Sequence, residues 1–72
     1  MNDRPDLSLV MPAYNEEKNI RLVIERADDV ARQMRLSYEL IVVDDGSVDN
    51  TKVEVEGYAR HNGHVKIASY TN

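Results

Sequence analysis

Two adjacent carboxylates follow an apolar stretch of the chain, and their position raises the question of what chemistry they serve. In the segment LIVVDDGSVDNT, residues 40–51, Asp44 and Asp45 come directly after four apolar residues. Successive residues of a strand point to opposite faces, so these two side chains cannot easily hold one ion from the same side. A metal site built from the pair alone is therefore not expected. The Asp44 carboxylate could instead accept hydrogen bonds from the ring N–H of a base or from ribose hydroxyls.

The three residues after Asp44 also permit a simpler interpretation. Asp45, Gly46 and Ser47 are residue types that build turns, because their side-chain oxygens or backbone freedom satisfy the geometry of a tight connection. The sequence alone leaves open whether these residues contact a ligand or only shape the turn.

A second group of candidate residues lies in PAYNE, residues 12–16. Tyr14 could stack on a base, and Glu16 could accept a hydrogen bond from a ribose or bind a cation indirectly. In the alternative interpretation, Tyr14 is a packing residue and Asn15 is the N-cap of a helix. The two histidines, His61 and His64, have no carboxylate at ligand spacing beside them, and we interpret them as surface residues because metal sites usually need three or more protein ligands.

The elements that position these residues can be predicted from the apolar periodicity. Spacings of four and three residues from Ile20 to Met34 indicate one face of an amphipathic helix, and the apolar run before Asp44 is typical of a strand covered on both faces. Ser47 or Asp49 could cap a second helix, although Gly57 inside it is unfavourable by about 1 kcal/mol relative to alanine. We expect strands at residues 7–12, 38–43 and 65–70, a helix from Asn15 to about Arg35, and a helix that ends at Asn62-Gly63.

This βαβαβ order predicts an α/β fold with a parallel sheet and right-handed crossovers. We expect a three-layer sandwich that forms half of a doubly wound, Rossmann-like nucleotide-binding domain. Ligands of such sheets bind outside the carboxyl ends of the strands. The segments PAYNE and DDGS both fall at that end.

Length and composition limit the possible functions. The chain has 72 residues, a net charge of -4 and no cysteine. It is therefore one small domain without disulfides, and oligomerisation is a natural source of further stability. The basic residues are scattered, which does not favour nucleic acid binding. No apolar run is long enough to span a membrane, so we expect a cytoplasmic protein.

Two segments together resemble a known family. LSLVMPAYNEEKNI, followed about two dozen residues later by YELIVVDDGSVDNT, is similar to the amino-terminal end of family 2 glycosyltransferases with the GT-A fold. The similarity is greatest to the dolichyl-phosphate and polyprenyl-phosphate sugar synthases. These enzymes transfer a sugar from a nucleoside diphosphate donor to a lipid phosphate, and full-length members can work at the cytoplasmic face of a membrane.

The resemblance implies a role for each matching residue. The first acid of the pair, Asp44, reads the base of the nucleotide, and Asp49 and Thr51 match residues that start a helix. The implied nucleotide-binding residues are Pro12, Ala13, Tyr14 and Glu16, which line the pocket, and Asp44, Asp45, Gly46 and Ser47, which form the other wall.

The sequence also departs from the family. Full-length members use a divalent cation, Mg or Mn, bound by an Asp-x-Asp motif downstream of the third strand, and no such triplet occurs in residues 1–72. We therefore expect that residues 1–72 bind no cation tightly, contain no catalytic residue and have no transferase activity alone. On this interpretation, they are an incomplete amino-terminal part of a GT-A domain.

Two other hypotheses remain at this point. An acidic pair after an apolar strand also occurs in phosphoacceptor receiver domains, although there it follows the first strand. A structural alternative is self-association, because in the complete GT-A fold another strand lies beside the first one. We predict a homodimer through the exposed edge of that strand, with Leu7, Leu9 and Met11 near the contact.

Overall fold

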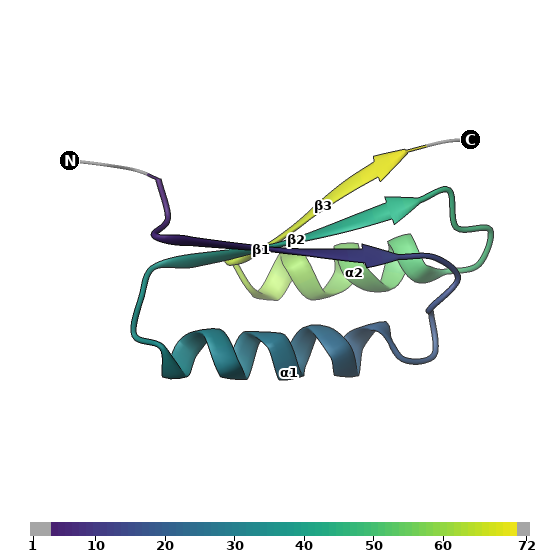
Figure 1. Cartoon of the computed structure of the whole chain (residues 1–72). Helices are drawn as coiled ribbons and strands as arrows, with labels where there is room; N and C mark the ends of the chain where they lie inside the picture. Colours follow the sequence, from purple (N-terminus) through teal and green to yellow (C-terminus); the bar gives the residue numbers. More distant parts are fainter. Residues whose placement is uncertain (1–3, 71–72) are drawn as a thin grey trace.

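The chain folds into a three-stranded parallel sheet with two helices (Figure 1). The computed structural model describes residues 4–70. The elements are β1 (Leu7–Ala13), α1 (Ile20–Gln33), β2 (Tyr38–Asp45), α2 (Thr51–His61) and β3 (Val65–Tyr70), and the strand order in the sheet is β1-β2-β3. The predicted βαβαβ order, the parallel sheet and the α/β class of half a Rossmann-like domain are confirmed.

Both helices lie on the same face of the sheet (Figure 1). The two right-handed crossovers move in the same direction across the sheet, from β1 to β2 and from β2 to β3, so they place their helices on the same side. Residues 4–70 thus form two layers, and the predicted three-layer sandwich is not found in this part of the chain. Ile41 and Val43, which point to the open face, are only half-buried.

The core lies between the helices and every second residue of the strands. Leu40 and Val42 of β2 are fully buried and pack between Ile24 of α1 and Val55 of α2. The face predicted for α1 is correct at Ile20, Ile24 and Ala31, but Met34 at its end is 51% exposed. The remaining buried apolar residues are Ala13, Tyr38 and Val65.

The outer edge of β1 has no neighbouring strand among the described residues. The Leu7 amide donates to the Ser37 carbonyl on the β2 side, so alternation directs the backbone groups of Ser8 and Val10 to the free edge. The backbone of Pro12 faces the free edge as well. Its missing N–H therefore removes no hydrogen bond to β2, which explains why a proline is tolerated inside this strand.

The start of α1 differs from the prediction. Asn15 was expected to be its N-cap, but the helix begins at Ile20 with Asn19 before it. Asn15 has a φ of 51°, a left-handed conformation that asparagine tolerates better than most residues. A separate turn, closed by the Ile20 amide donating to the Glu16 carbonyl at 2.8 Å, occupies the segment in between.

Gly57 in α2 lies beside α1, and we predict that Gly57→Ala stabilises the protein by about 0.5–1 kcal/mol. A Cβ at this position would lie 3.1 Å from Nη2 of Arg21, whose guanidinium pairs with Glu54. Because the contact is the end of a flexible side chain, a small shift of Arg21 accommodates it. Urea denaturation of both proteins measures the difference. A loss of stability would mean that Arg21 cannot move.

Candidate functional site

The loops after β1 and β2 meet beyond the carboxyl ends of these strands, where both predicted segments lie. Ala13 and Asp44 are partners in the register of the two strands. The chain leaves β1 into residues 14–19 and leaves β2 into residues 46–50. The structure thus brings PAYNE and DDGS side by side, as expected for parallel neighbouring strands.

Side chains of the second loop and of the first residue of α2 bind the backbone of the first loop. Ser47 Oγ accepts from the Asn15 amide at 2.9 Å, and Thr51 Oγ1 accepts from the Glu16 amide at 2.7 Å. In return, the Val48 amide donates to Asn15 Oδ1 at 2.9 Å. Asn15 therefore links the two loops instead of capping a helix. These bonds fix the distance between the two loops.

Asp49 holds the start of α2 to the same network. Its carboxylate accepts from the Thr51 amide at 2.9 Å, from the Thr51 hydroxyl and from the Glu17 amide at 3.3 Å. Desolvation alone would raise the pKa of Asp49, but the hydrogen bonds from Thr51 and Glu17 outweigh it, and the pKa is lowered. The carboxylate is therefore kept ionised as a structural acceptor.

Asp44 and Asp45 point to opposite faces of the sheet. Both belong to β2, where Asp44 is 2% exposed on the helix side and Asp45 is exposed on the other side. Asp44 Oδ1 accepts from the Ser47 hydroxyl and from the Ser47 amide at 3.4 Å. Gly46 between them has a φ of 72°, a left-handed conformation that glycine adopts without strain. The turn thus folds Ser47 back onto Asp44.

The predicted site residues differ widely in accessibility. Tyr14 is 57% exposed, and Pro12 and Glu16 are exposed as well. Ala13 is buried beneath them, and Gly46 and Ser47 are half-buried. Tyr14 is therefore not part of the core among the described residues.

A depression of about 290 Å³ lies next to the first loop. Its lining residues are Asn15, Glu16, Glu17, Lys18, Asn19 and Asp49. Within residues 4–70, no three His, Asp or Glu side chains are grouped so that they could hold a metal ion.

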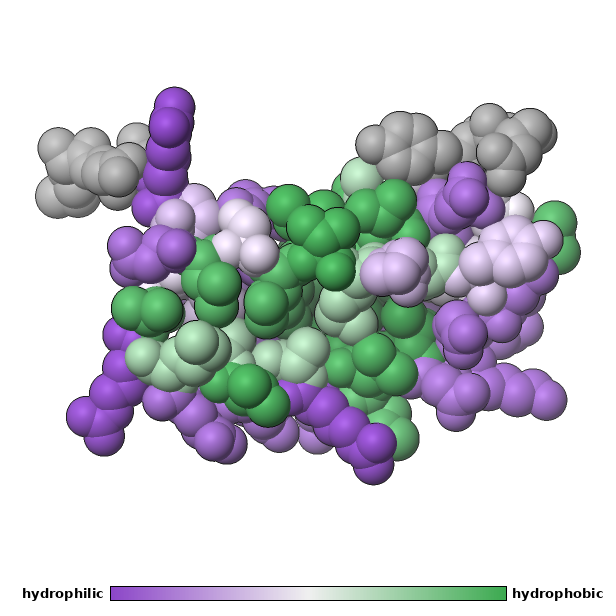
Figure 2. Space-filling model, viewed as in Figure 1, coloured by the Kyte–Doolittle hydropathy of each residue, from purple (hydrophilic) through white to green (hydrophobic). Residues whose placement is uncertain are grey.

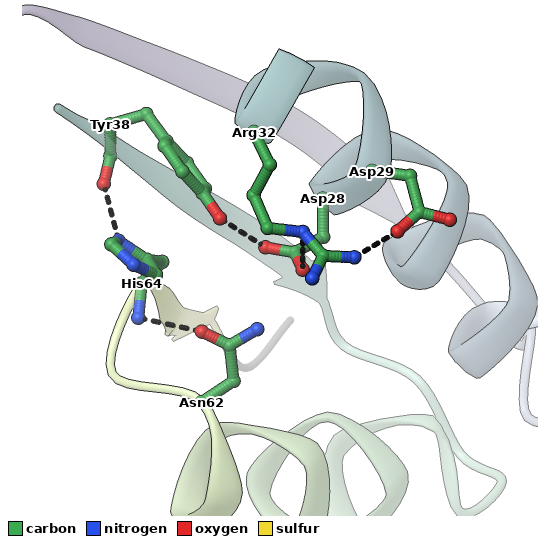
Figure 3. Close-up of polar contacts among 6 residues, drawn as sticks. All are labelled: Asp28, Asp29, Arg32, Tyr38, Asn62 and His64. Atoms are coloured by element: carbon green, nitrogen blue, oxygen red, sulfur yellow. Dashed lines mark hydrogen bonds and ion pairs between the residues drawn. The ribbon is translucent and has the colours of Figure 1, made fainter. Parts of the chain in front are cut away.

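A second polar cluster lies at the other end of the strands, near the start of β2, and it was not predicted from the sequence (Figure 3). Tyr38 Oη donates to Asp28 Oδ1 at 2.7 Å, and both side chains are buried. Arg32 lies across this pair, with Nε 3.4 Å from Asp28 Oδ2, and also binds Asp29. The signal was present in the sequence, because Asp28 interrupts the apolar face of α1 between Ile24 and Ala31.

Burial and the Asp28 carboxylate raise the pKa of Tyr38 to about 12. Burial disfavours the charged phenolate. The Asp28 carboxylate accepts a hydrogen bond from the neutral phenol and would repel the phenolate, so both of its effects favour the protonated form. The guanidinium of Arg32 also has a raised pKa, chiefly because of its bond to Asp29. The phenol therefore remains protonated at neutral pH and serves as a buried donor.

His64 is part of this cluster although it was interpreted as a surface residue. Its side chain is exposed, but its ring stacks on Tyr38 with centroids 4.1 Å apart, and Nδ1 lies 3.0 Å from the Tyr38 carbonyl oxygen. The His64 amide also donates to Asn62 Oδ1 at 2.9 Å (Figure 3). These contacts hold the turn before β3, and His61 makes none of them.

Comparison with known protein families identifies the class of protein. The α/β fold and the two motifs define a domain of the glycosyltransferase class, and residues 8–71 match the family Glycosyl transferase family 2. The chain belongs to this family. The receiver-like alternative is left without support.

Several relatives have names that specify a reaction. The chain is 36% identical over 66 residues to an undecaprenyl-phosphate 4-deoxy-4-formamido-L-arabinose transferase of Serratia proteamaculans, and 39% identical over 66 residues to the transferase of that name from Proteus mirabilis. Each match covers 92% of this chain and 20% of the relative. An uncharacterized glycosyltransferase of Synechocystis is 36% identical over 64 residues, which cover 89% of this chain and 20% of that protein.

The chain spans about a fifth of the length of these relatives. In the part of the chain that the structure describes, no helix is long and apolar enough to cross a membrane.

Proposed function

We propose that this chain supplies the base-and-ribose-binding part of a glycosyltransferase that transfers a sugar from a nucleoside diphosphate donor to a polyprenyl phosphate. The single observation that carries the proposal is the position of Asp44. It is a nearly buried carboxylate at the carboxyl edge of the sheet, next to the junction of two loops held together by hydrogen bonds. The names of the relatives support a polyprenyl phosphate acceptor, and such an acceptor would bring the complete enzyme to the cytoplasmic face of a membrane.

In this proposal each wall of the pocket has a distinct task. The exposed ring of Tyr14 stacks on the base, while Glu16 accepts from a ribose hydroxyl. Asp44 accepts from the ring N–H of the base and thereby selects it. The backbone at Pro12 and Ala13 forms the floor, and the turn at Asp45, Gly46 and Ser47 forms the side.

The Ser47 hydroxyl determines how the base reaches Asp44. Because Ser47 donates to Asp44 Oδ1 in this structure, the base N–H must either use the other carboxylate oxygen or replace the serine as donor. If the base N–H replaces the Ser47 hydroxyl, the Asp44 carboxylate keeps the same number of hydrogen bonds. This exchange therefore carries no large desolvation cost.

Residues 1–72 are proposed to bind the donor without catalysing transfer. Asp44 and Asp45 lie on opposite faces and cannot chelate one ion between them, so this pair would not supply a Lewis acid for the diphosphate. Assays with a nucleoside diphosphate sugar and a polyprenyl phosphate should give no product with this chain alone. Any turnover would contradict this part of the proposal.

The test of nucleotide binding is isothermal titration of the 72-residue chain with UDP, GDP, CDP and ADP. We expect measurable heat for at least one of them, and a dissociation constant at least tenfold higher for Asp44→Asn, because the amide loses the negative charge that attracts the base N–H. Asn keeps the shape of the side chain and can still accept from Ser47.

Asp29→Asn is the matched control, since it removes one carboxylate from an exposed position of α1 outside both loops. It should leave the dissociation constant unchanged. The proposal fails if no nucleotide at millimolar concentration produces heat in a folded sample, or if Asp44→Asn binds as tightly as the original chain.

A further inference from the structure

Hydrogen bonds, and not apolar packing, hold together the two loops beyond the carboxyl ends of β1 and β2. Figure 2 shows that this end of the molecule, on the right, is largely hydrophilic, whereas the middle is largely hydrophobic. The large apolar residues of the two loops, Tyr14 and Val48, are 57% and 87% exposed. The position of Tyr14 relative to Asp44 therefore depends on polar contacts between the loops.

The Ser47 hydroxyl connects the first loop to the Asp44 carboxylate. Ser47 Oγ accepts from the Asn15 amide at 2.9 Å and donates to Asp44 Oδ1, which also accepts from the Ser47 amide at 3.4 Å. A hydroxyl has one proton to donate. Ser47 therefore uses that proton on Asp44 while its oxygen accepts from the residue that follows Tyr14.

A second hydroxyl makes the same kind of bridge to a different carboxylate. Thr51 Oγ1 accepts from the Glu16 amide at 2.7 Å and donates to Asp49 Oδ1. Two neighbouring amides of the first loop are thus each joined through a hydroxyl to an acid of the second loop or of the strand before it. The two bridges can be compared directly, because they differ in the acid at which they end.

The two acids differ in what their second oxygen does. Asp49 Oδ2 accepts from the Glu17 amide at 3.3 Å, so both oxygens of Asp49 are engaged. Within residues 4–70 no hydrogen bond reaches Asp44 Oδ2, and no buried side-chain oxygen of these residues lacks a partner. Although Asp44 is only 2% exposed, its Oδ2 therefore reaches the surface as an acceptor that a ligand can use.

The bonds of Ser47 favour Oδ2 over Oδ1 as the atom that binds the base. A base N–H that displaced the hydroxyl from Oδ1 would conserve the bonds of Asp44 but not those of Ser47. The half-buried hydroxyl would lose its acceptor while its oxygen remained bound to the Asn15 amide, and a polar group without a partner is unfavourable. Binding at Oδ2 keeps both bonds of the serine.

We propose that Ser47 is a positioning residue for base recognition, an inference that rests on the proposed role of Asp44. Its hydroxyl stays on Oδ1, holds the carboxylate so that Oδ2 receives the ring N–H, and fixes this oxygen relative to the loop that presents Tyr14. Ser47 thus acts on the base through Asp44. Stacking on Tyr14 and the hydrogen bond to Asp44 reach the same base because Ser47 joins the two elements.

Isothermal titration with UDP and GDP, whose bases have a ring N–H, tests this role. Ser47→Ala should raise the dissociation constant of the nucleotide that binds by about tenfold, because the charged acceptor is no longer held in place. Ser47→Thr keeps the hydroxyl and should rescue most of this loss. In an Asp44→Asn chain, Ser47→Ala should have much less effect, because the two residues act as one unit.

Thr51→Val is the matched control, since it removes the other hydroxyl bridge to the first loop and leaves Ser47 and Asp44 in place. Any loosening of the loops that it causes acts independently of Asp44. Its effect on the dissociation constant should therefore be the same in the original chain and in the Asp44→Asn chain. Circular dichroism must show the same helix content for all variants.

Amide hydrogen exchange in the chain without nucleotide distinguishes failure of this inference from failure of the proposed function. Ser47→Ala should speed the exchange of the Asn15 amide by about tenfold and leave the Glu16 amide unchanged, whereas Thr51→Val should do the reverse.

The role of Ser47 is overturned, with the proposed function intact, if a nucleotide binds but Ser47→Ala weakens it equally in both backgrounds. An Asn15 amide that exchanges alike in the original chain and in Ser47→Ala would overturn it as well. If the folded chain binds neither UDP nor GDP, the proposed recognition of a ring N–H by Asp44 fails, and the role of Ser47 fails with it.

Discussion

Asp28→Ala is expected to lower the free energy of unfolding by about 2–3 kcal/mol. The substitution leaves the Tyr38 hydroxyl as a buried donor without its acceptor, and an unsatisfied buried polar group costs roughly 1–3 kcal/mol. The small space left beside Tyr38 adds to this cost. Arg32 adds little, because its side chain is 61% exposed and water can replace the lost carboxylate. Urea denaturation monitored by circular dichroism measures the loss.

Asp29→Ala provides the matched control for this prediction. It removes a neighbouring carboxylate that binds the same arginine but is 49% exposed, so we expect a change within about 0.5 kcal/mol. In a double-mutant cycle, Asp28→Ala combined with Tyr38→Phe should cost less than the sum of the two single changes, because the orphaned donor is gone. Equal losses for Asp28→Ala and Asp29→Ala would show that burial of the Asp28–Tyr38 pair is unimportant.

The order of elements could be predicted because it depends on local periodicity. The strand at Val65–Tyr70 has the predicted bounds, and β2 extends two residues beyond the prediction to include Asp44 and Asp45. That extension makes the opposite orientation of the two acids a property of the strand itself. The argument against a shared ion from the pair therefore followed from the sequence.

The start of α1 could not be predicted because long-range contacts determine it. Locally, Asn15 followed by Glu16 and Glu17 has the composition of a helix N-terminus. The amides of Asn15 and Glu16 instead donate to side chains of the second loop and of the start of α2, more than thirty residues away. The residues next to Asn15 in the sequence do not indicate these distant partners. The hydrogen bond between Asp28 and Tyr38 could not be predicted for the same reason.

The number of layers was mispredicted for a different reason. A continuous apolar run such as Leu40–Val43 is typical of a strand covered on both faces, and this is a statement about the complete fold. Within residues 4–70 the second cover is absent, and Ile41 and Val43 stay half-buried. Within residues 4–70, the apolar run thus overestimates how far the open face of β2 is covered.

Alkaline pH is expected to destabilise the protein through Tyr38. An unfolded tyrosine has a pKa of about 10, whereas that of Tyr38 in the folded state is raised to about 12. The folded state therefore holds the phenolic proton more tightly. The resulting stability is fully present below pH 10 and is lost as the pH rises from about 10 through 12. Two pKa units correspond to a contribution of at most about 2.7 kcal/mol.

The comparison of the original chain with Tyr38→Phe separates this effect from the titration of other groups. At neutral pH the variant should be less stable by about 1–2 kcal/mol, because the Asp28 carboxylate loses its buried donor. Above pH 10 the difference between the two proteins should shrink, since only the original chain must ionise a buried phenol. Urea denaturation at pH 7, 9, 10 and 11 measures both. A difference that stays constant over this range would show that the Tyr38 phenol titrates alike in the folded and unfolded chains, and that its burial against Asp28 does not hold the proton.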